Sequence, residues 1–161
     1  MPSILIVCTA NICRSPMAEA ILKAMIAKRP DVEQWHIESA GTWARDGSPA
    51  ALLSQFVVQE LGMDISNHRS KPVTRALMRR FDLILTMERQ QKEGLILQYK
   101  HFADRIYMLS EMVGKLEDIP DPIGGEYEYY QATARLMERF LSGGLEKMIQ
   151  LAKQPDGKIT S

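Results

Sequence analysis

Residues 3–20, SILIVCTANICRSPMAEA, decide the fold of this 161-residue chain. Residues 3–7 are apolar and rich in β-branched side chains, which predicts a strand buried on both faces. A loop follows at residues 8–15. Ser15-Pro16 has the form of a helix start, with serine as N-cap and proline at the first helical position, and the helical pattern runs to Pro30. The segment therefore predicts a strand, a loop and a helix, in that order.

The rest of the chain repeats the alternation of strands and helices. Further strands are predicted at residues 36–40, 81–86 and 105–109. Helices are predicted at residues 48–61 with Gly62 as the stop, from about Glu88, and after residue 125 with a break at Gly143-Gly144. Such alternation predicts an α/β fold, a single doubly wound domain with a central four-stranded parallel sheet flanked by helices on both faces. Ligands of such sheets bind beyond the carboxyl ends of the strands, where Cys8 falls.

Composition limits the partners and the location. Twenty Lys and Arg residues balance twenty Asp and Glu, so the formal net charge is zero and no basic field favours nucleic acid or an anionic membrane. No apolar stretch reaches the length of a membrane span, and the first residues lack the basic region of a signal peptide. We expect a cytoplasmic protein with one domain at residues 1–153 and a polar tail at residues 154–161.

The number and spacing of the cysteines indicate a reactive thiol and not a disulfide cross-link. The only cysteines, Cys8 and Cys13, lie too close together to staple a fold, which argues against a secreted disulfide scaffold. The three histidines, His36, His68 and His101, show no spacing typical of metal ligands. We expect no metal and no other cofactor.

The loop after the first strand has the spacing of an anion site. Five residues separate Cys8 from Arg14, which lets the loop curl around one tetrahedral oxyanion, with its backbone N–H groups and the positive end of the next helix directed inward. Arg14 can hold two oxygens of a phosphate, and the same positive environment favours the nucleophilic thiolate form of Cys8. The remaining residues expected to line this phosphate-binding loop are Thr9, Ala10, Asn11, Ile12 and Cys13.

Two loop residues have expected supporting roles. Ser15 is placed to donate a hydrogen bond to the sulfur of Cys8 and to help it leave, and Asn11 tolerates a left-handed backbone. The alternative is that Cys8 merely ends a buried strand and Arg14 is a solvated surface charge. The strand before the loop and the helix start after it favour the functional interpretation.

Residues 8–20, CTANICRSPMAEA, resemble the N-terminal signature of low-molecular-weight protein tyrosine phosphatases. Asp121-Pro122 resembles the distal general-acid motif of that family, and the resemblance extends over nearly the whole chain. It implies hydrolysis of phosphotyrosine through a phosphocysteine on Cys8, without a metal. On chemistry alone Asp118 is nearly as good an acid as Asp121, and both could be ordinary turn residues. The resemblance selects Asp121, which would protonate the tyrosine oxygen and then accept a proton from water.

The resemblance also implies roles for residues around the loop. The family holds the asparagine that matches Asn11 with a serine and a histidine, which correspond here to Ser39 and His68; a solvated loop histidine is an equal alternative. As in relatives with both cysteines, Cys13 would form a reversible disulfide with Cys8 on oxidation. The equal alternative for Cys13 is a small apolar residue that packs beneath the loop.

Three residues bear on the substrate. Ile12 resembles the tyrosine-directed members, whereas protein-arginine phosphatases of the same fold typically carry threonine there. Trp43 is a candidate second wall of the pocket, or a core residue. Ile123 stands where many relatives place an aromatic residue after Asp-Pro, and this departure weakens the case for stacking on a phosphotyrosine ring. The expected partners are a phosphotyrosine protein, with a tyrosine kinase as one candidate, and phosphate or a similar oxyanion in the site.

Three other functions compete with this prediction. The first is a protein-arginine phosphatase of the same fold. The second, a thioredoxin-coupled arsenate reductase, needs two further cysteines downstream, and none follows Cys13. The third is a non-catalytic phosphate-binding module, which would have no need of a cysteine nucleophile, an arginine and a distal acid together.

Overall fold

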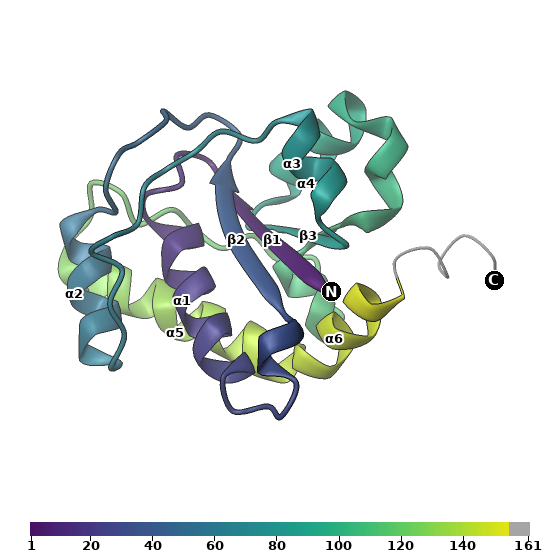
Figure 1. Ribbon diagram of the computed structural model, residues 1–161. Coiled ribbons are helices and arrows are strands. Elements are labelled where there is room, and N and C mark those ends of the chain that lie inside the picture. Colours follow the sequence, from purple (N-terminus) through teal and green to yellow (C-terminus); the bar gives the residue numbers. More distant parts are fainter. Residues whose placement is uncertain (155–161) are drawn as a thin grey trace.

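The computed structural model describes residues 1–154, and the predicted polar tail from residue 155 onward lies outside the described residues. Its sheet has four parallel strands in the order β2-β1-β3-β4 (Figure 1). The strands are β1 (Ser3–Cys8), β2 (His36–Gly41), β3 (Leu83–Thr86) and β4 (Ile106–Met108). The α/β fold with a four-stranded parallel sheet is therefore confirmed.

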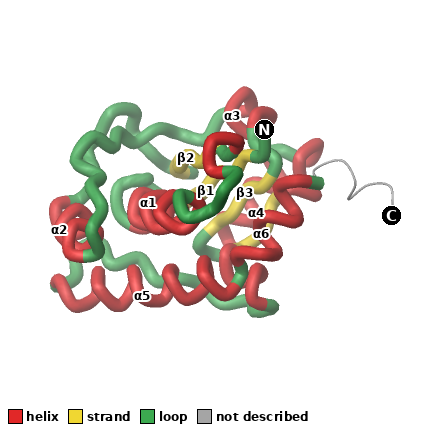
Figure 2. The backbone as a smooth tube through the Cα atoms, turned by 60° about the horizontal axis from the view of Figure 1, so that its bottom comes forward, coloured by secondary structure: helices red, strands yellow, loops and turns green. Residues whose placement is uncertain are grey.

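Helices cover both faces of the sheet, as predicted. One side carries α1 (Arg14–Ile26), α2 (Leu52–Glu60), α5 (Tyr127–Gly143) and α6 (Leu145–Lys153), with α2 packed against α1 and α5 (Figure 2). The other side carries α3 (Arg75–Arg80) and α4 (Arg89–Gln98). Three 3-10 helices complete the described chain: η1 (Val32–Gln34), η2 (Lys100–Arg105) and η3 (Leu109–Val113). Sequence reasoning missed α3, a helix of only 6 residues.

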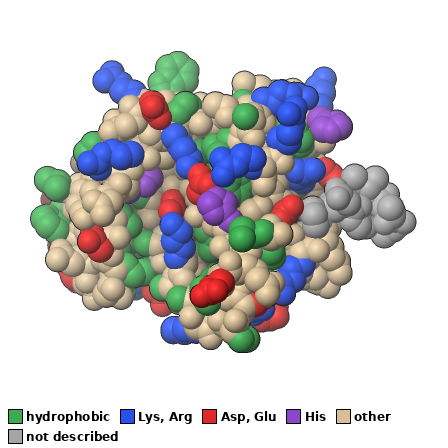
Figure 3. All heavy atoms as spheres, viewed as in Figure 1, with side chains coloured by type: hydrophobic (Ala, Val, Ile, Leu, Met, Phe, Trp, Pro, Cys, Tyr) green, Lys and Arg blue, Asp and Glu red, His purple; other side chains and the backbone are tan. Residues whose placement is uncertain are grey.

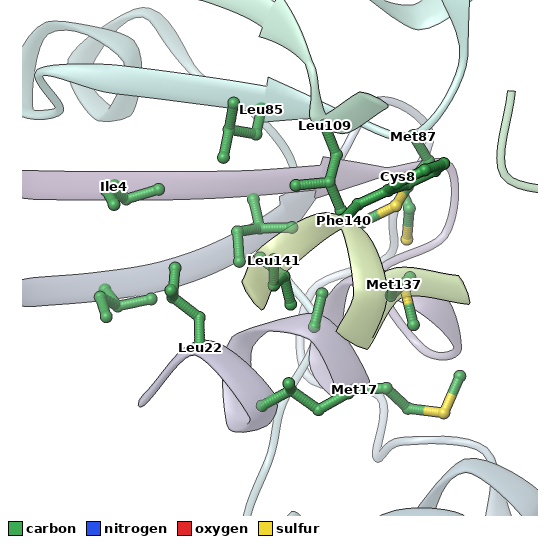
Figure 4. Close-up of a cluster of buried hydrophobic side chains, with 14 of the residues drawn as sticks. Ile4, Cys8, Met17, Leu22, Leu85, Met87, Leu109, Met137, Phe140 and Leu141 are labelled. Atoms are coloured by element: carbon green, nitrogen blue, oxygen red, sulfur yellow. The ribbon is translucent and has the colours of Figure 1, made fainter. Parts of the chain in front are cut away.

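The sequence of β1 is a continuous apolar run because this strand is buried on both faces of the sheet. Alternate residues point to opposite faces: Ile4 and Ile6 pack with α1 and α5, whereas Leu5 and Val7 pack with α3 and α4. Cys8 continues the first set and lies beside the core cluster of Figure 4. The nucleophile candidate is thus the last residue of a strand buried on both faces, so a rigid core fixes its backbone.

Two helix starts differ from the prediction. Cys13 is the N-cap of α1, so Ser15 is not the N-cap but a residue of the first turn. Helix α2 begins at Leu52 instead of residue 48, because the N–H of Ala51 bonds to Ile12 O at 2.9 Å and the N–H of Ser48 bonds to Ser70 Oγ at 3.0 Å. The backbone before α2 is therefore used to support the loop.

The predicted helix ends at glycines are confirmed. Gly62 follows α2 with φ of 89°, and the Gly143-Gly144 pair separates α5 from α6. Strands β3 and β4 begin later than predicted, at Leu83 and Ile106. Acidic and basic side chains are interspersed on the face in Figure 3. None of the helices in residues 1–154 is long and apolar enough to cross a membrane.

Candidate active site

The loop at residues 9–13 joins β1 to α1 at the carboxyl edge of the sheet. Asn11 has φ of 59°, the left-handed conformation that asparagine tolerates. The end of β2 holds the loop from the side: the N–H of Thr42 bonds to Cys8 O and the N–H of Trp43 bonds to Thr9 O, both at 2.9 Å. A Cβ at Gly41 would lie 2.3 Å from Thr9 O, so this close approach requires glycine.

Within residues 1–154, the backbone amides of the loop have no protein partner. Among the described residues, no backbone N–H from Thr9 to Ser15 donates a hydrogen bond, and no side chain caps the start of α1. Asn11 and Ser15 are fully buried, so these amides are a row of donors at a helix N-terminus with restricted access to water. Such a row fits an oxyanion, which accepts several hydrogen bonds at once.

Cys8 and Ser15 are in direct contact. Cys8 Sγ lies 2.9 Å from Ser15 Oγ, and both residues are buried. Ser15 Oγ also accepts a hydrogen bond of 2.7 Å from Asn11 Nδ2. Because the amide is the donor there, the hydroxyl hydrogen of Ser15 is free to donate to the sulfur.

Asn11 links the loop to three other segments. Its Nδ2 also donates to Ser39 Oγ at 3.0 Å, and its Oδ1 accepts from the N–H of Lys71 at 3.0 Å. His68 Nε2 lies 2.7 Å from Asn11 O, so His68 touches the loop and is not a free surface histidine. Ser39 Oγ in turn donates to Glu19 Oε1 at 2.6 Å. The role of Glu19 was not predicted from the sequence, although Glu19 lies within residues 3–20.

Arg14 is 1% exposed and held from several sides. Its Nη1 donates to Glu88 Oε2 and to Ile119 O, both at 2.7 Å, and its Nη2 lies 3.4 Å from Thr9 Oγ1. Nη2 also lies 3.5 Å from Asp121 Oδ2. The buried Nε has no hydrogen-bond partner among the described residues, which leaves one donor of the guanidinium for an oxyanion.

Sequence reasoning also missed Glu88, which it assigned only to a helix start. Glu88 is the N-cap of α4 and lies two residues after the end of β3, at the same edge of the sheet as Cys8. That position was the available signal, since the carboxyl ends of parallel strands share one edge. The carboxylate of Glu88 fixes the orientation of the Arg14 guanidinium.

The structure separates the two candidate acids. Asp118 Oδ1 accepts a hydrogen bond of 2.8 Å from the N–H of Arg89, at the start of α4. Asp121 is exposed; its Oδ1 accepts from the N–H of Ile123 at 3.1 Å, while Oδ2 faces Arg14. Only Asp121 lines the hollow that contains Cys8.

That hollow measures about 50 Å³, enough for a group larger than one water. The residues lining it are Cys8, Ala10, Ile12, Cys13, Arg14, Asp121 and Ile123. Trp43 is not among them: it is 85% exposed and lines a different hollow of about 490 Å³ with Thr9, Glu88 and Gln91. Among residues 1–154, no group of three or more His, Cys, Asp or Glu side chains could hold a metal ion.

Cys13 is a buried free thiol, as is Cys8. Its Sγ lies 3.8 Å from the hydroxyl of Tyr130 on α5, and burial raises the pKa of the Cys13 thiol to about 11. The environment is that of a small side chain packed beneath the loop, and it opposes the thiolate form that attack on an oxidised Cys8 requires. Disulfide formation between the two cysteines stays a prediction.

A parallel sheet in an α/β fold, with a cysteine and an arginine on an anion-binding loop at its carboxyl edge, indicates a protein that binds phosphate groups. Comparison with known proteins narrows the class. The sequence model of the low molecular weight phosphotyrosine protein phosphatase family matches residues 3–154. The chain belongs to this family, whose members are phosphoric monoester hydrolases.

Relatives with two different substrate names share the fold. A protein-arginine-phosphatase of Bacillus subtilis strain 168 is 37% identical over 152 residues, covering 94% of this chain and 95% of the relative. The low molecular weight protein-tyrosine-phosphatase Wzb of Escherichia coli K12 is 34% identical over 137 residues, covering 85% of this chain and 88% of Wzb. The crystal structure of a low molecular weight protein tyrosine phosphatase from T. tengcongensis superposes with a TM-score of 0.83 at 36% identity, covering 91% of this chain and 99% of that one.

Proposed function

We propose that this enzyme hydrolyses phosphotyrosine monoesters in proteins through a phosphocysteine on Cys8. One observation carries the proposal: Cys8, Arg14 and Asp121 line a single small hollow whose other walls include Ile12 and Ile123. A nucleophile, an anion holder and an acid therefore meet beside an apolar surface that suits a phenyl ring.

In this proposal each group has a role that its contacts support. The thiolate of Cys8 attacks phosphorus while the loop amides and Arg14 Nε hold the phosphoryl oxygens. The bond from phosphorus to the tyrosine oxygen breaks, and protonated Asp121 supplies the proton that the phenolate needs. Water then attacks the phosphocysteine and gives a proton to Asp121, so that phosphate leaves. Ser15 donates a hydrogen bond to the departing thiolate of Cys8 and lowers the barrier of this second step.

A protein-arginine phosphatase is the second candidate, favoured by the 37% identical relative of that name. A phosphoarginine leaving group is a polar guanidine and prefers hydrogen-bonding walls. The hollow instead presents Ile12 and Ile123. The two isoleucines favour the phenyl ring.

The partner we propose is a phosphotyrosine protein, with a tyrosine kinase as one candidate, and the site of action is the cytoplasm. The supporting argument is the nucleophile itself, because a catalytic thiol must stay reduced and the cytosol keeps thiols reduced. Two free cysteines agree with such a compartment.

The test compares p-nitrophenyl phosphate with two peptides of identical flanks, one carrying phosphotyrosine and one phosphoarginine. We expect the higher kcat/KM on the phosphotyrosine peptide, no turnover in Cys8→Ser, and a loss of roughly 10²–10⁴-fold in Asp121→Asn on the phosphotyrosine peptide. Asp118→Asn is the matched control and should stay within about threefold of wild type, since Asp118 bonds to the N–H of Arg89 and does not line the catalytic hollow. Higher kcat/KM on phosphoarginine would reject tyrosine specificity, and a loss in Asp118→Asn alone would move the acid role.

A further inference from the structure

A second hollow, of about 530 Å³, lies between the loop at residues 120–125 and the exposed side of α5. Its walls include Ile123 from the loop and Tyr129, Ala132 and Leu136 from α5. Asp121 at its edge is the one charged residue of the lining. Ile123 is 54% exposed and Tyr129 63% exposed, so two large side chains that line this hollow face solvent. Exposed apolar surface gathered in a concave site is typical of a binding site.

The second hollow adjoins the catalytic one. Asp121 and Ile123 line both, so a residue next to the phosphorylated side chain lies close to the second hollow. The hollow that contains Trp43 differs: its lining includes Glu88, Gln90 and Gln91, and it shares no lining residue with the catalytic hollow. Apolar surface thus flanks the catalytic hollow on the α5 side.

The loop that forms one wall is tightly built. The N–H of Gly125 bonds to Pro122 O at 2.9 Å, and Gly124 has φ of 79°. A Cβ at Gly125 would lie 2.8 Å from a ring carbon of Tyr129, so glycine lets the aromatic ring pack directly on the loop. The wall is therefore held in place before a ligand binds, which lowers the entropic cost of binding.

We propose that this hollow is a specificity subsite that takes an apolar side chain of the phosphoprotein, close in sequence to the phosphorylated residue. The inference rests on the proposed function, because it needs a phosphorylated side chain in the catalytic hollow. An extended substrate advances about 3.3 Å per residue, so the side chains near the phosphoresidue are the ones within reach. An acidic side chain is disfavoured there, because its carboxylate would lose water among apolar walls whose described lining holds no cationic side chain.

The test uses phosphotyrosine peptides in a serine background, with a single leucine moved through the three positions on each side. The measured quantity is kcat/KM for each peptide divided by kcat/KM for p-nitrophenyl phosphate, which occupies only the catalytic hollow. We expect leucine at one or two positions to raise this ratio about tenfold, the scale of burying one apolar side chain. Aspartate at the same positions should lower the ratio below that of serine.

Two variants connect the preference to the hollow. Leu136→Ser and Tyr129→Ser remove apolar walls, and each should reduce the leucine advantage to less than about threefold. Leu97→Ser is the matched control, because Leu97 is 71% exposed on α4 and lines none of the hollows described here. Thermal unfolding of all three variants checks that the fold is intact.

The outcomes separate the subsite from the proposed function. Hydrolysis without any leucine preference, or a preference that survives both α5 substitutions, overturns the subsite and leaves the phosphatase proposal standing. If no peptide is hydrolysed, the proposed function fails. In that case the affinity of Cys8→Ser for leucine and serine peptides, measured by fluorescence anisotropy, still decides the subsite: equal affinities overturn it and a tenfold difference supports it.

Discussion

Replacement of Asn11 by alanine tests whether the side chain of this residue holds the loop together. The change removes three hydrogen bonds, to the hydroxyls of Ser15 and Ser39 and from the N–H of Lys71. At about 1 kcal/mol each they contribute about 3 kcal/mol. Alanine in the left-handed conformation at φ of 59° costs about 1–2 kcal/mol more. We expect the free energy of unfolding, from urea titration, to fall by about 4–5 kcal/mol.

Asn11→Gly separates strain from hydrogen bonding. Glycine loses the same three bonds but accepts the left-handed backbone, and its greater freedom in the unfolded state costs about 0.5–1 kcal/mol. We therefore expect glycine to be about 1 kcal/mol less destabilising than alanine. Both variants should lose about tenfold or more in kcat, because Ser15 no longer has the amide that directs its hydroxyl to Cys8. A loss below about 1 kcal/mol in alanine, or glycine below alanine in stability, would refute this reasoning.

Two further predictions concern glycine sites and the second thiol. Gly144→Ala should lower the free energy of unfolding by about 1–3 kcal/mol, because the new Cβ would lie 2.4 Å from the Cβ of Met112. Gly94→Ala in α4 meets nothing within 4 Å and should raise the free energy of unfolding by about 0.5–1 kcal/mol. Urea unfolding that gives both changes the same sign would contradict this packing. Burial raises the pKa of the Cys13 thiol to about 11. In Cys8→Ser, iodoacetamide should therefore alkylate Cys13 far more slowly than it alkylates glutathione at pH 8. The rate of Cys13 alkylation should rise about tenfold per pH unit up to pH 10, because the thiolate is the reactive form. Mass spectrometry that finds Cys13 modified as fast as glutathione at pH 8 would show that the thiol is not shielded.

The sequence by itself determined the order of the four strands and of the longer helices, the parallel sheet and the loop between Cys8 and Arg14. These features depend on local information. Apolar runs predict buried strands, and the glycines at 62 and 143–144 mark helix ends. The five residues between Cys8 and Arg14 set the length of the loop that joins strand and helix. The residue type also showed that Asn11 tolerates a left-handed backbone, which the structure has at this position.

Only the tertiary structure decided which distant side chains complete the site. Glu88 reaches Arg14 across 74 residues and Ile119 reaches it across 105, and no local pattern encodes contacts at such separations. On chemistry alone Asp118 and Asp121 were nearly equal candidates, and the structure turns the carboxylate of Asp121 toward Arg14 and that of Asp118 toward the N–H of Arg89. The exposure of Trp43 depends likewise on how the end of β2 packs against the loop. Side-chain direction is set by packing between elements, which is why sequence alone left these assignments open.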